Sequence, residues 1–163
     1  MHNKFGILIG QFTVFSKEVN EGTDLTNVHY TKDLRENQLP IIDVALSELN
    51  NNGGVVISAP CGEGKTAMAL NLICELKKKT LILVHNENLL DQWIDRISFF
   101  TNVTSVGKIK GKIMDIDHDI VIGMIQSISM KSLPLKTFES FGTVVIDECR
   151  SESVFKSTSK GCN

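Results

Sequence analysis

A glycine-rich segment carries the strongest chemical signal in the sequence. It fits the pattern of a phosphate-binding loop, except that alanine replaces the first glycine. Gly62 and Gly64 permit backbone conformations that turn successive N–H groups toward phosphate oxygens. An apolar run precedes the segment and an amphipathic stretch follows it, so we expect a strand, the loop and a helix N-terminus in that order. The segment runs Ala59-Pro60-Cys61-Gly62-Glu63-Gly64-Lys65-Thr66.

The residue types in this loop predict ATP and Mg²⁺ as ligands. Lys65 would reach the β- and γ-phosphates, and the Thr66 hydroxyl would bind the metal ion. A match of this kind arises by chance in on the order of one in a hundred chains of this length. The alternative is a glycine turn with an exposed lysine, which the flanking strand and helix patterns disfavour.

An acidic pair, Asp147-Glu148, follows the apolar run over residues 143–146. Ligands of open α/β sheets gather at the carboxyl ends of the strands. Asp147 would hold Mg²⁺, and Glu148 would polarise the attacking water. Taken alone, such a pair is more often a helix cap or a solvated turn. Together with the upstream loop it predicts Glu148 and Lys65 as the catalytic residues.

The elements that must position these residues follow from the periodicity of the chain. The alternation of strand and helix patterns predicts an α/β fold, a mainly parallel, doubly wound sheet with helices on both faces. Residues 1–30 are predicted to form an N-terminal extension containing a short strand, and residues 31–163 the main domain. Helices are predicted over 38–49, 64–76, 87–100 and 134–141, and strands over 55–57, 81–84, 105–110, 119–123 and 143–146.

Composition sets limits on the class of protein. A chain of 163 residues can bury one compact core but is short for two domains. The formal net charge of −2 neither supports nor excludes a nucleic-acid partner. No apolar stretch is long enough to cross a bilayer, so no membrane is expected. The four cysteines form no C-x-x-C pair, which favours free thiols in an intracellular setting; they are Cys61, Cys74, Cys149 and Cys162.

Together, the loop and the acidic pair resemble motifs I and II of superfamily 2 helicases. Leu34 to Gln38 is similar to the element upstream of motif I, Val84 to Trp93 to the motif Ia region, and Val121 to Ser127 to a later nucleic-acid segment. The closest subgroup contains the xeroderma pigmentosum B-type helicases, type III restriction subunits and helicases of large DNA viruses and phages. The resemblance covers about residues 31–149. It implies a RecA-like first motor domain that hydrolyses ATP and moves along nucleic acid, with DNA favoured over RNA.

The resemblance also implies roles for individual residues. Gln38 would recognise adenine, and residues 59–66 would hold the phosphates. Trp93 lies on the apolar stripe of its helix and is predicted to belong to the core rather than to a base-stacking surface. A basic cluster at Lys108, Lys110 and Lys112 fits a nucleic-acid surface and a solvated loop equally well. The residues implied to contact nucleic acid are His85, Asn86, Gly123 and Gln126.

Two features depart from the family pattern. Arg150 stands where this subgroup usually has a histidine that couples the ATP site to the nucleic acid. The sequence ends at Asn163, before the Ser-Ala-Thr motif and the second RecA-like domain, so we expect a domain incomplete at its C-terminus and a partner chain that supplies the second domain.

Two other hypotheses stay open at this point. One is a non-catalytic module that binds nucleotide or DNA without turnover. The other is a phosphate-loop ATPase with no nucleic-acid role, against which Gln38, Gln92-Trp93 and Gly123-x-x-Gln126 argue.

Overall fold

The computed structural model describes residues 5–10, 21–60 and 62–149, with the side chains of 21–60 and 62–147. The strands are β1 (Phe5–Gly10), β2 (Gly54–Ile57), β3 (Thr80–Val84), β4 (Gly107–Lys110), β5 (Ile113–Asp115), β6 (Ile120–Met124) and β7 (Thr143–Cys149). The helices are α1 (Leu39–Asn52), α2 (Lys65–Leu76), α3 (Glu87–Phe100), α4 (Ile125–Ser129) and the 3₁₀ helix η1 (Leu135–Phe138).

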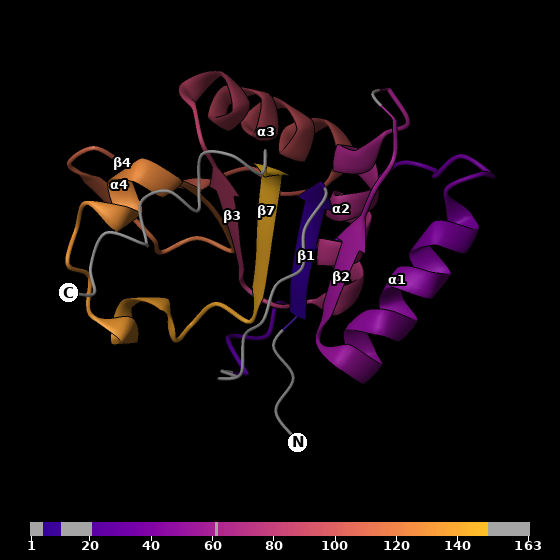
Figure 1. Cartoon of the computed structure of the whole chain (residues 1–163), viewed down its shortest axis with the longest axis horizontal. Helices are drawn as coiled ribbons and strands as arrows, with labels where there is room; N and C mark the ends of the chain where they lie inside the picture. The colour runs from indigo at the N-terminus through magenta and orange to yellow at the C-terminus, as the bar shows by residue number, and fades with distance from the viewer. Residues whose placement is uncertain (1–4, 11–20, 61, 150–163) are drawn as a thin grey trace, which may run out of the picture.

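The described strands form a single sheet in the order β2-β1-β7-β3-β6-β4-β5. Every neighbouring pair is parallel except β4 with β5. The carboxyl ends of the six parallel strands therefore meet at one edge, the upper edge in Figure 1. This arrangement confirms the predicted α/β fold with a mainly parallel sheet.

Alternation along the strands assigns the side chains to two faces of the sheet. In β3, Ile82 and Val84 belong to the main core with helices α1, α2 and α3. Leu81 lies in a second core on the opposite face, with Phe138 of η1 and Ile128 of α4 packed against it. Helices therefore cover both faces, as the sequence predicts, and α2 lies behind the sheet in Figure 1.

The first strand lies inside the sheet, not in an extension ahead of the domain. β1 pairs in parallel with β2 on one side and with β7 on the other. Residues 21–30 also pack against the domain, because Leu25 and Val28 are buried beside Cys74 of α2. Periodicity within residues 1–30 predicts a strand but not its partners, since pairing is a tertiary property.

Three further details differ from the sequence-based expectation. Residues 112–118, expected to be a loop, contain β5, which forms a hairpin with β4 through Gly111 at φ +54°. The predicted helix over 134–141 is a single 3₁₀ turn at residues 135–138. The short helix α4 was not predicted. It folds back over β6 at Gly123, where a Cβ atom would lie 2.7 Å from Ile128 Cδ1.

The long helices begin and end close to the predicted residues. Asn86 precedes α3, and its Oδ1 accepts a hydrogen bond from the Leu89 amide at 2.9 Å, which satisfies one of the free N–H groups of the first turn. Gly53 ends α1 in a left-handed conformation with φ 72°. Among the helices of the described ranges, none has the length and apolar character needed to span a bilayer.

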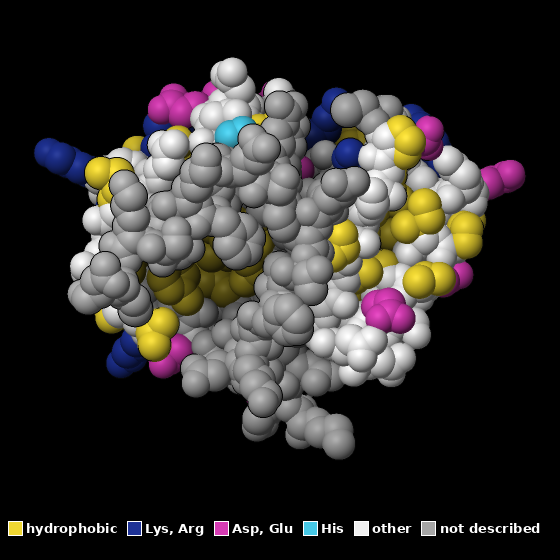
Figure 2. All heavy atoms as spheres, viewed as in Figure 1, with side chains coloured by type: hydrophobic (Ala, Val, Ile, Leu, Met, Phe, Trp, Pro, Cys, Tyr) yellow, Lys and Arg dark blue, Asp and Glu magenta, His cyan; other side chains and the backbone are white. Residues whose placement is uncertain are grey.

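Hydrophobic side chains remain exposed where α1 lies beside the edge strand β2. Ile41 and Val44 of α1 and Val56 of β2 are 38%, 62% and 42% exposed. Figure 2 shows hydrophobic side chains at the surface on the right, over these two elements.

Burial of Cys74 on α2 makes a prediction about stability at high pH. Desolvation, followed by the nearby charge of Glu75, raises the pKa of the Cys74 thiol from 9.0 to about 12. In the unfolded chain the thiol ionises near its ordinary pKa, whereas in the folded chain it keeps its proton. The contribution of this thiol is therefore fully present below that ordinary pKa and falls by about 1.4 kcal/mol per pH unit above it.

Urea unfolding at about pH 8 and about pH 10 tests this expectation in the wild type and in Cys74→Ala. The wild type should lose about 1.4 kcal/mol more than the variant between the two conditions. Comparing each protein with itself removes the cost of the small cavity that alanine leaves. Equal losses would mean that the thiol ionises as readily in the folded state as in the unfolded chain.

Candidate functional site

The glycine-rich loop has the backbone conformation that phosphate binding requires. Gly62 and Gly64 adopt left-handed conformations with φ 88° and φ 78°, which L-residues with side chains rarely reach. Helix α2 begins immediately after Gly64, and no side chain caps its first turn. The free N–H groups of that turn, with the positive end of the helix dipole, form an arrangement that attracts an anion.

Lys65, the first residue of α2, is folded back over the loop that precedes it. Its Nζ donates a hydrogen bond to the Ala59 carbonyl oxygen at 2.7 Å. Lys65 and its neighbour Thr66 are both half-buried at the beginning of the helix. The ammonium group is thus held at the loop by a weak neutral acceptor, which phosphate oxygens would replace with a charged one.

Side chains from residues 35–38 donate hydrogen bonds to the loop. Gln38 is only 3% exposed, and its Nε2 donates to the Glu63 carbonyl oxygen at 2.8 Å. Its Oε1 accepts from the Arg35 amide at 3.0 Å. The Asn37 amide donates to Glu63 Oε2 at 3.2 Å, and Arg35 Nη1 donates to the Gly62 carbonyl oxygen at 3.4 Å.

The structure therefore places Gln38 in contact with the phosphate loop, with both ends of its carboxamide bonded to protein. The sequence pattern predicted adenine recognition for this residue, which remains a proposal. It did not predict the supporting contacts of Arg35 and Asn37. The available signal was their position in the same polar run ahead of α1.

Asp147 lies at the carboxyl end of β7 and faces α3. Because side chains alternate along a strand, Asp147 is on the same face as Val145, which is buried in the main core. Asp147 Oδ2 accepts a hydrogen bond from Trp93 Nε1 at 2.6 Å. Trp93 is 1% exposed, which confirms that it belongs to the core. No local pattern predicts its bond to Asp147, because 54 residues separate the two.

The oxygen donors at this edge fit Mg²⁺ better than a softer metal. Mg²⁺ is bound in proteins by one or two carboxylates together with hydroxyl, water and phosphate oxygens. Asp147 and Thr66 are donors of this kind. Within residues 21–60 and 62–147, no three His, Cys, Asp or Glu side chains converge in a way that could hold a metal by themselves. The side chains of Cys61, Glu148 and Arg150 lie outside the described residues.

The four residues implied to contact nucleic acid lie along the same edge of the sheet. Strand β3 pairs with β6 in a register that sets Leu83 against Gly123 and Val84 against Met124. His85 and Asn86 therefore emerge beside the beginning of α4, which carries the exposed Gln126.

Two of the four also have structural roles. Asn86 caps α3, and Gly123 is buried under Ile128. The side chains of His85 and Asn86 contact each other, with 3.0 Å between His85 Nε2 and Asn86 Nδ2.

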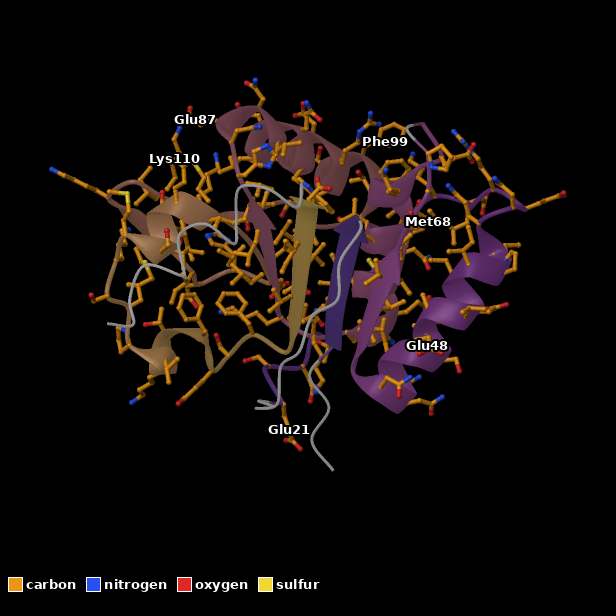
Figure 3. All side chains as sticks on the ribbon, viewed as in Figure 1. Glu21, Glu48, Met68, Glu87, Phe99 and Lys110 are labelled. Atoms are coloured by element: carbon orange, nitrogen blue, oxygen red, sulfur yellow. The ribbon has the colours of Figure 1, made fainter. Side chains whose placement is uncertain are left out.

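Lys110, at the carboxyl end of β4, forms an ion pair at this edge. Its Nζ lies 2.9 Å from Glu87 Oε2 in the first turn of α3, and the two side chains approach each other in Figure 3. Both are substantially exposed to solvent, at 38% and 61% of their side-chain surface. Part of the predicted basic cluster is therefore neutralised by a carboxylate of the same chain.

The sheet order sets these groups side by side. Along the edge come the phosphate loop after β2, then β1, then Asp147 on β7, the pair His85 and Asn86 after β3, and Gln126 after β6. Neighbouring strands lie about 4.8 Å apart, so the strands that carry the loop and Asp147 are separated by about 10 Å. The predicted nucleotide and nucleic-acid residues thus occupy adjacent parts of one edge.

Comparison with known proteins identifies relatives of the kind that the sequence motifs resemble. Residues 31–153 match the family model of the type III restriction enzyme res subunit. A protein of Acanthamoeba polyphaga mimivirus, L396, provisionally described as an ATP-dependent RNA helicase, is 40% identical over 119 residues, 73% of this chain. Protein 161L of Invertebrate iridescent virus 6, provisionally described as a helicase, is 35% identical over 121 residues, 71% of this chain. The DNA repair helicase/translocase XPB-R of Trypanosoma brucei brucei is 31% identical over 101 residues, 60% of this chain.

The chain corresponds to only part of each of these relatives. The matched region spans 23% of the mimivirus protein, 27% of the iridescent virus protein and 13% of the trypanosome protein.

The contact between Gly64 and Gln38 makes a prediction about the loop. A Cβ atom at Gly64 would lie 2.5 Å from Gln38 Nε2, whereas one at Gly62 would meet nothing within 4 Å. Both glycines have positive φ, so alanine at either position costs about 1–2 kcal/mol of backbone strain. Gly64→Ala should therefore lower the free energy of unfolding by about 1 kcal/mol more than Gly62→Ala, because only the former displaces the Gln38 amide from Glu63.

Denaturant unfolding of the two variants measures this difference, and Gly62→Ala is the matched control for strain. In a Gln38→Ala background, Gly64→Ala and Gly62→Ala should lower the free energy of unfolding by similar amounts, because the group that Gly64→Ala displaces is already gone. Equal stability of the two single variants would contradict a supporting role of Gln38.

Proposed function

This chain belongs to the superfamily 2 helicases, in the family of the type III restriction enzyme res subunit, and we propose that it binds ATP with Mg²⁺ and couples ATP hydrolysis to movement along nucleic acid. The observation that carries the proposal is the loop itself. Two left-handed glycines lead into an uncapped helix N-terminus at the sheet edge that also bears Asp147.

The loop supports triphosphate binding through charge and geometry. The N–H groups at the beginning of α2 would donate to phosphate oxygens, and Lys65 would exchange its bond to Ala59 for the β- and γ-phosphates. Pro60, Cys61 and Glu63 complete the loop. Gln38 would meet the adenine while its carboxamide supports the loop at Glu63.

When bound, Mg²⁺ would supply positive charge that neutralises the triphosphate. Thr66 and Asp147 would hold it, since Thr66 lies in the first turn of α2 and Asp147 near the carboxyl end of β7. Glu148 would orient the attacking water and accept its proton.

Nucleic acid would lie across the carboxyl ends of β3 and β6. His85, Asn86 and Gln126 offer an imidazole and two amides, which suit phosphate and sugar contacts that carry no sequence information. Gly123 is buried and would contribute indirectly. Because it has no side chain, Ile128 of α4 can pack closely on β6, which places the exposed Gln126 at this edge. We take DNA as the substrate, as in the trypanosome relative's description, although the mimivirus relative is described as acting with RNA.

Full activity would need a second RecA-like domain, in the same protein or in a partner chain. Related phosphoryl-transfer enzymes gain about 10³–10⁵ in rate from an arginine supplied across such a cleft. The described domain would bind nucleotide with one wall of the site, so its turnover when isolated would be slow.

Lys65→Ala should weaken ATP binding by about 100-fold, because one charge-assisted hydrogen bond to phosphate is worth about 1.5–3 kcal/mol. Binding of a fluorescent ATP analogue, followed by anisotropy, measures the loss. The matched control is Lys136→Ala, which removes an exposed lysine from η1. Unchanged affinity in Lys65→Ala would overturn the phosphate-loop assignment.

Glu148→Gln, measured in the same series, should keep nucleotide affinity and lose hydrolysis. If the affinity fell together with the rate, Glu148 would have a structural role instead. Wild-type binding without any turnover, with or without added DNA, would favour the non-catalytic module.

Gln126→Ala should weaken DNA binding by about three- to tenfold and leave ATP affinity unchanged, because an exposed amide contributes about 1 kcal/mol through one hydrogen bond. Electrophoretic mobility shift with DNA and RNA of one sequence gives both affinities and the preference between them. Asn51→Ala, which removes an exposed amide from α1, serves as the control. Equal DNA affinity of the two variants would exclude Gln126 from the interface, and tighter RNA binding would reverse the proposed substrate.

A further inference from the structure

The structure points to a further residue of the metal site. We infer that Trp93 is a positioning residue that holds the Asp147 carboxylate in the orientation needed for Mg²⁺. The inference rests on the proposed function, which makes Asp147 a metal ligand, and assigns to Trp93 a role that neither its aromatic character nor its place in the core requires.

The bond between the two residues is close to obligatory. An indole nitrogen can only donate a hydrogen bond, and a buried N–H without a partner costs about 1–3 kcal/mol. Trp93 is 1% exposed, so water cannot serve as that partner. The N–H instead donates to Asp147 Oδ2 at 2.6 Å, a short distance of the kind found when the acceptor is charged.

The donor is held rigidly. Leu90, Trp93 and Ile97 all lie on the buried side of α3 and pack in the main core against Val84 of β3 and the other apolar side chains of that face of the sheet. A side chain as large as tryptophan cannot change rotamer in such surroundings without displacing several neighbours. The position of the indole N–H is therefore fixed relative to the sheet.

The acceptor lies near the carboxyl end of β7. Asp147 is half-buried and is the last residue of β7 whose side chain faces α3 within the described residues. A carboxylate has two torsions to restrict, and a hydrogen bond to one oxygen restricts both. Partners of this kind orient metal ligands, and their removal costs about 10- to 100-fold in metal affinity.

The chain contains a single tryptophan, so its intrinsic fluorescence reports on Trp93 alone. The first experiment titrates Mn²⁺, a paramagnetic substitute for Mg²⁺, into the wild-type chain saturated with a non-hydrolysable ATP analogue, which supplies the phosphate oxygens of the site, and follows the Trp93 emission. Binding at Asp147 should quench the emission, and Asp147→Asn should shift the quenching to about tenfold higher Mn²⁺ or more. Emission that does not respond to Mn²⁺, or responds equally in Asp147→Asn, would overturn the inference.

The second experiment removes the donor and keeps an aromatic ring. For Trp93→Phe, the affinity for a fluorescent ATP analogue is measured with and without Mg²⁺. Affinity without Mg²⁺ should stay within about twofold of wild type, while the Mg²⁺ concentration for half-maximal enhancement should rise about tenfold. Ile97→Val is the matched control, because it reduces packing in the same buried stripe of α3 without touching Asp147. An equal change in both variants would mean that packing, not the hydrogen bond, carries the effect.

A second variant covers the case in which Trp93→Phe does not fold. Replacement of the single tryptophan by benzothienylalanine keeps the size and shape of the ring system but exchanges the N–H for sulfur, and the same rise in the required Mg²⁺ is expected. A wild type that binds no nucleotide would contradict the proposed function, and the inference that rests on it would fall with it. Nucleotide binding with an unchanged Mg²⁺ requirement in the variant would overturn the role of Trp93 and leave the proposed function standing.

Discussion

The ladder that β1 forms with its two neighbours determines the geometry of the whole site. Among the described strands, β2 is hydrogen-bonded to β1 alone, and β1 connects it to β7. The phosphate loop follows β2 and Asp147 lies near the carboxyl end of β7, so their separation is set by the width of one intervening strand. The pairing of Ile9 with both Ile57 and Asp147 also sets the last residue of β2 level with Asp147. Helices α2 and α3 then contribute side chains, Lys65 and Trp93 among them, to a site whose width is set by the pairing of the strands.

The site is built in two layers around that spacing. The loop and Asp147 provide the groups that would meet nucleotide and metal, and buried polar side chains hold them in place. Gln38 supports the loop through Glu63, and Trp93 bonds to Asp147. Both supporting side chains are almost fully buried, which makes their hydrogen bonds costly to leave unmade. Helix α3 carries Trp93 on its buried side and begins at Asn86, so one rigid element reaches both parts of the sheet edge.

Local patterns in the sequence predicted what depends on local physics. The left-handed glycines follow from the spacing of the loop, and α3 was predicted over the residues it occupies because its apolar stripe is visible in the sequence. The position of β1 was not predictable in this way, since a short apolar run near Phe5 fits several places in a parallel sheet equally well. The bonds of Trp93 and Arg35 were missed for the same reason: each depends on which distant backbone comes near. Pro134 suggested a helix start, but only a 3₁₀ turn fits before β7 begins.

The Glu87–Lys110 ion pair has a consequence for how binding at this edge would respond to salt. Attraction between proteins and nucleic acids draws much of its strength from mobile counterions that are released into solution when lysines meet phosphates. The counterion of Lys110 is a carboxylate of the same chain, so the cations that a nucleic acid releases on meeting Lys110 would be offset by cations that Glu87 then attracts. Glu87 would then remain nearby as an unpaired negative charge. Contacts at this part of the edge would rely on hydrogen bonds from amides and backbone, and their strength would change little with ionic strength.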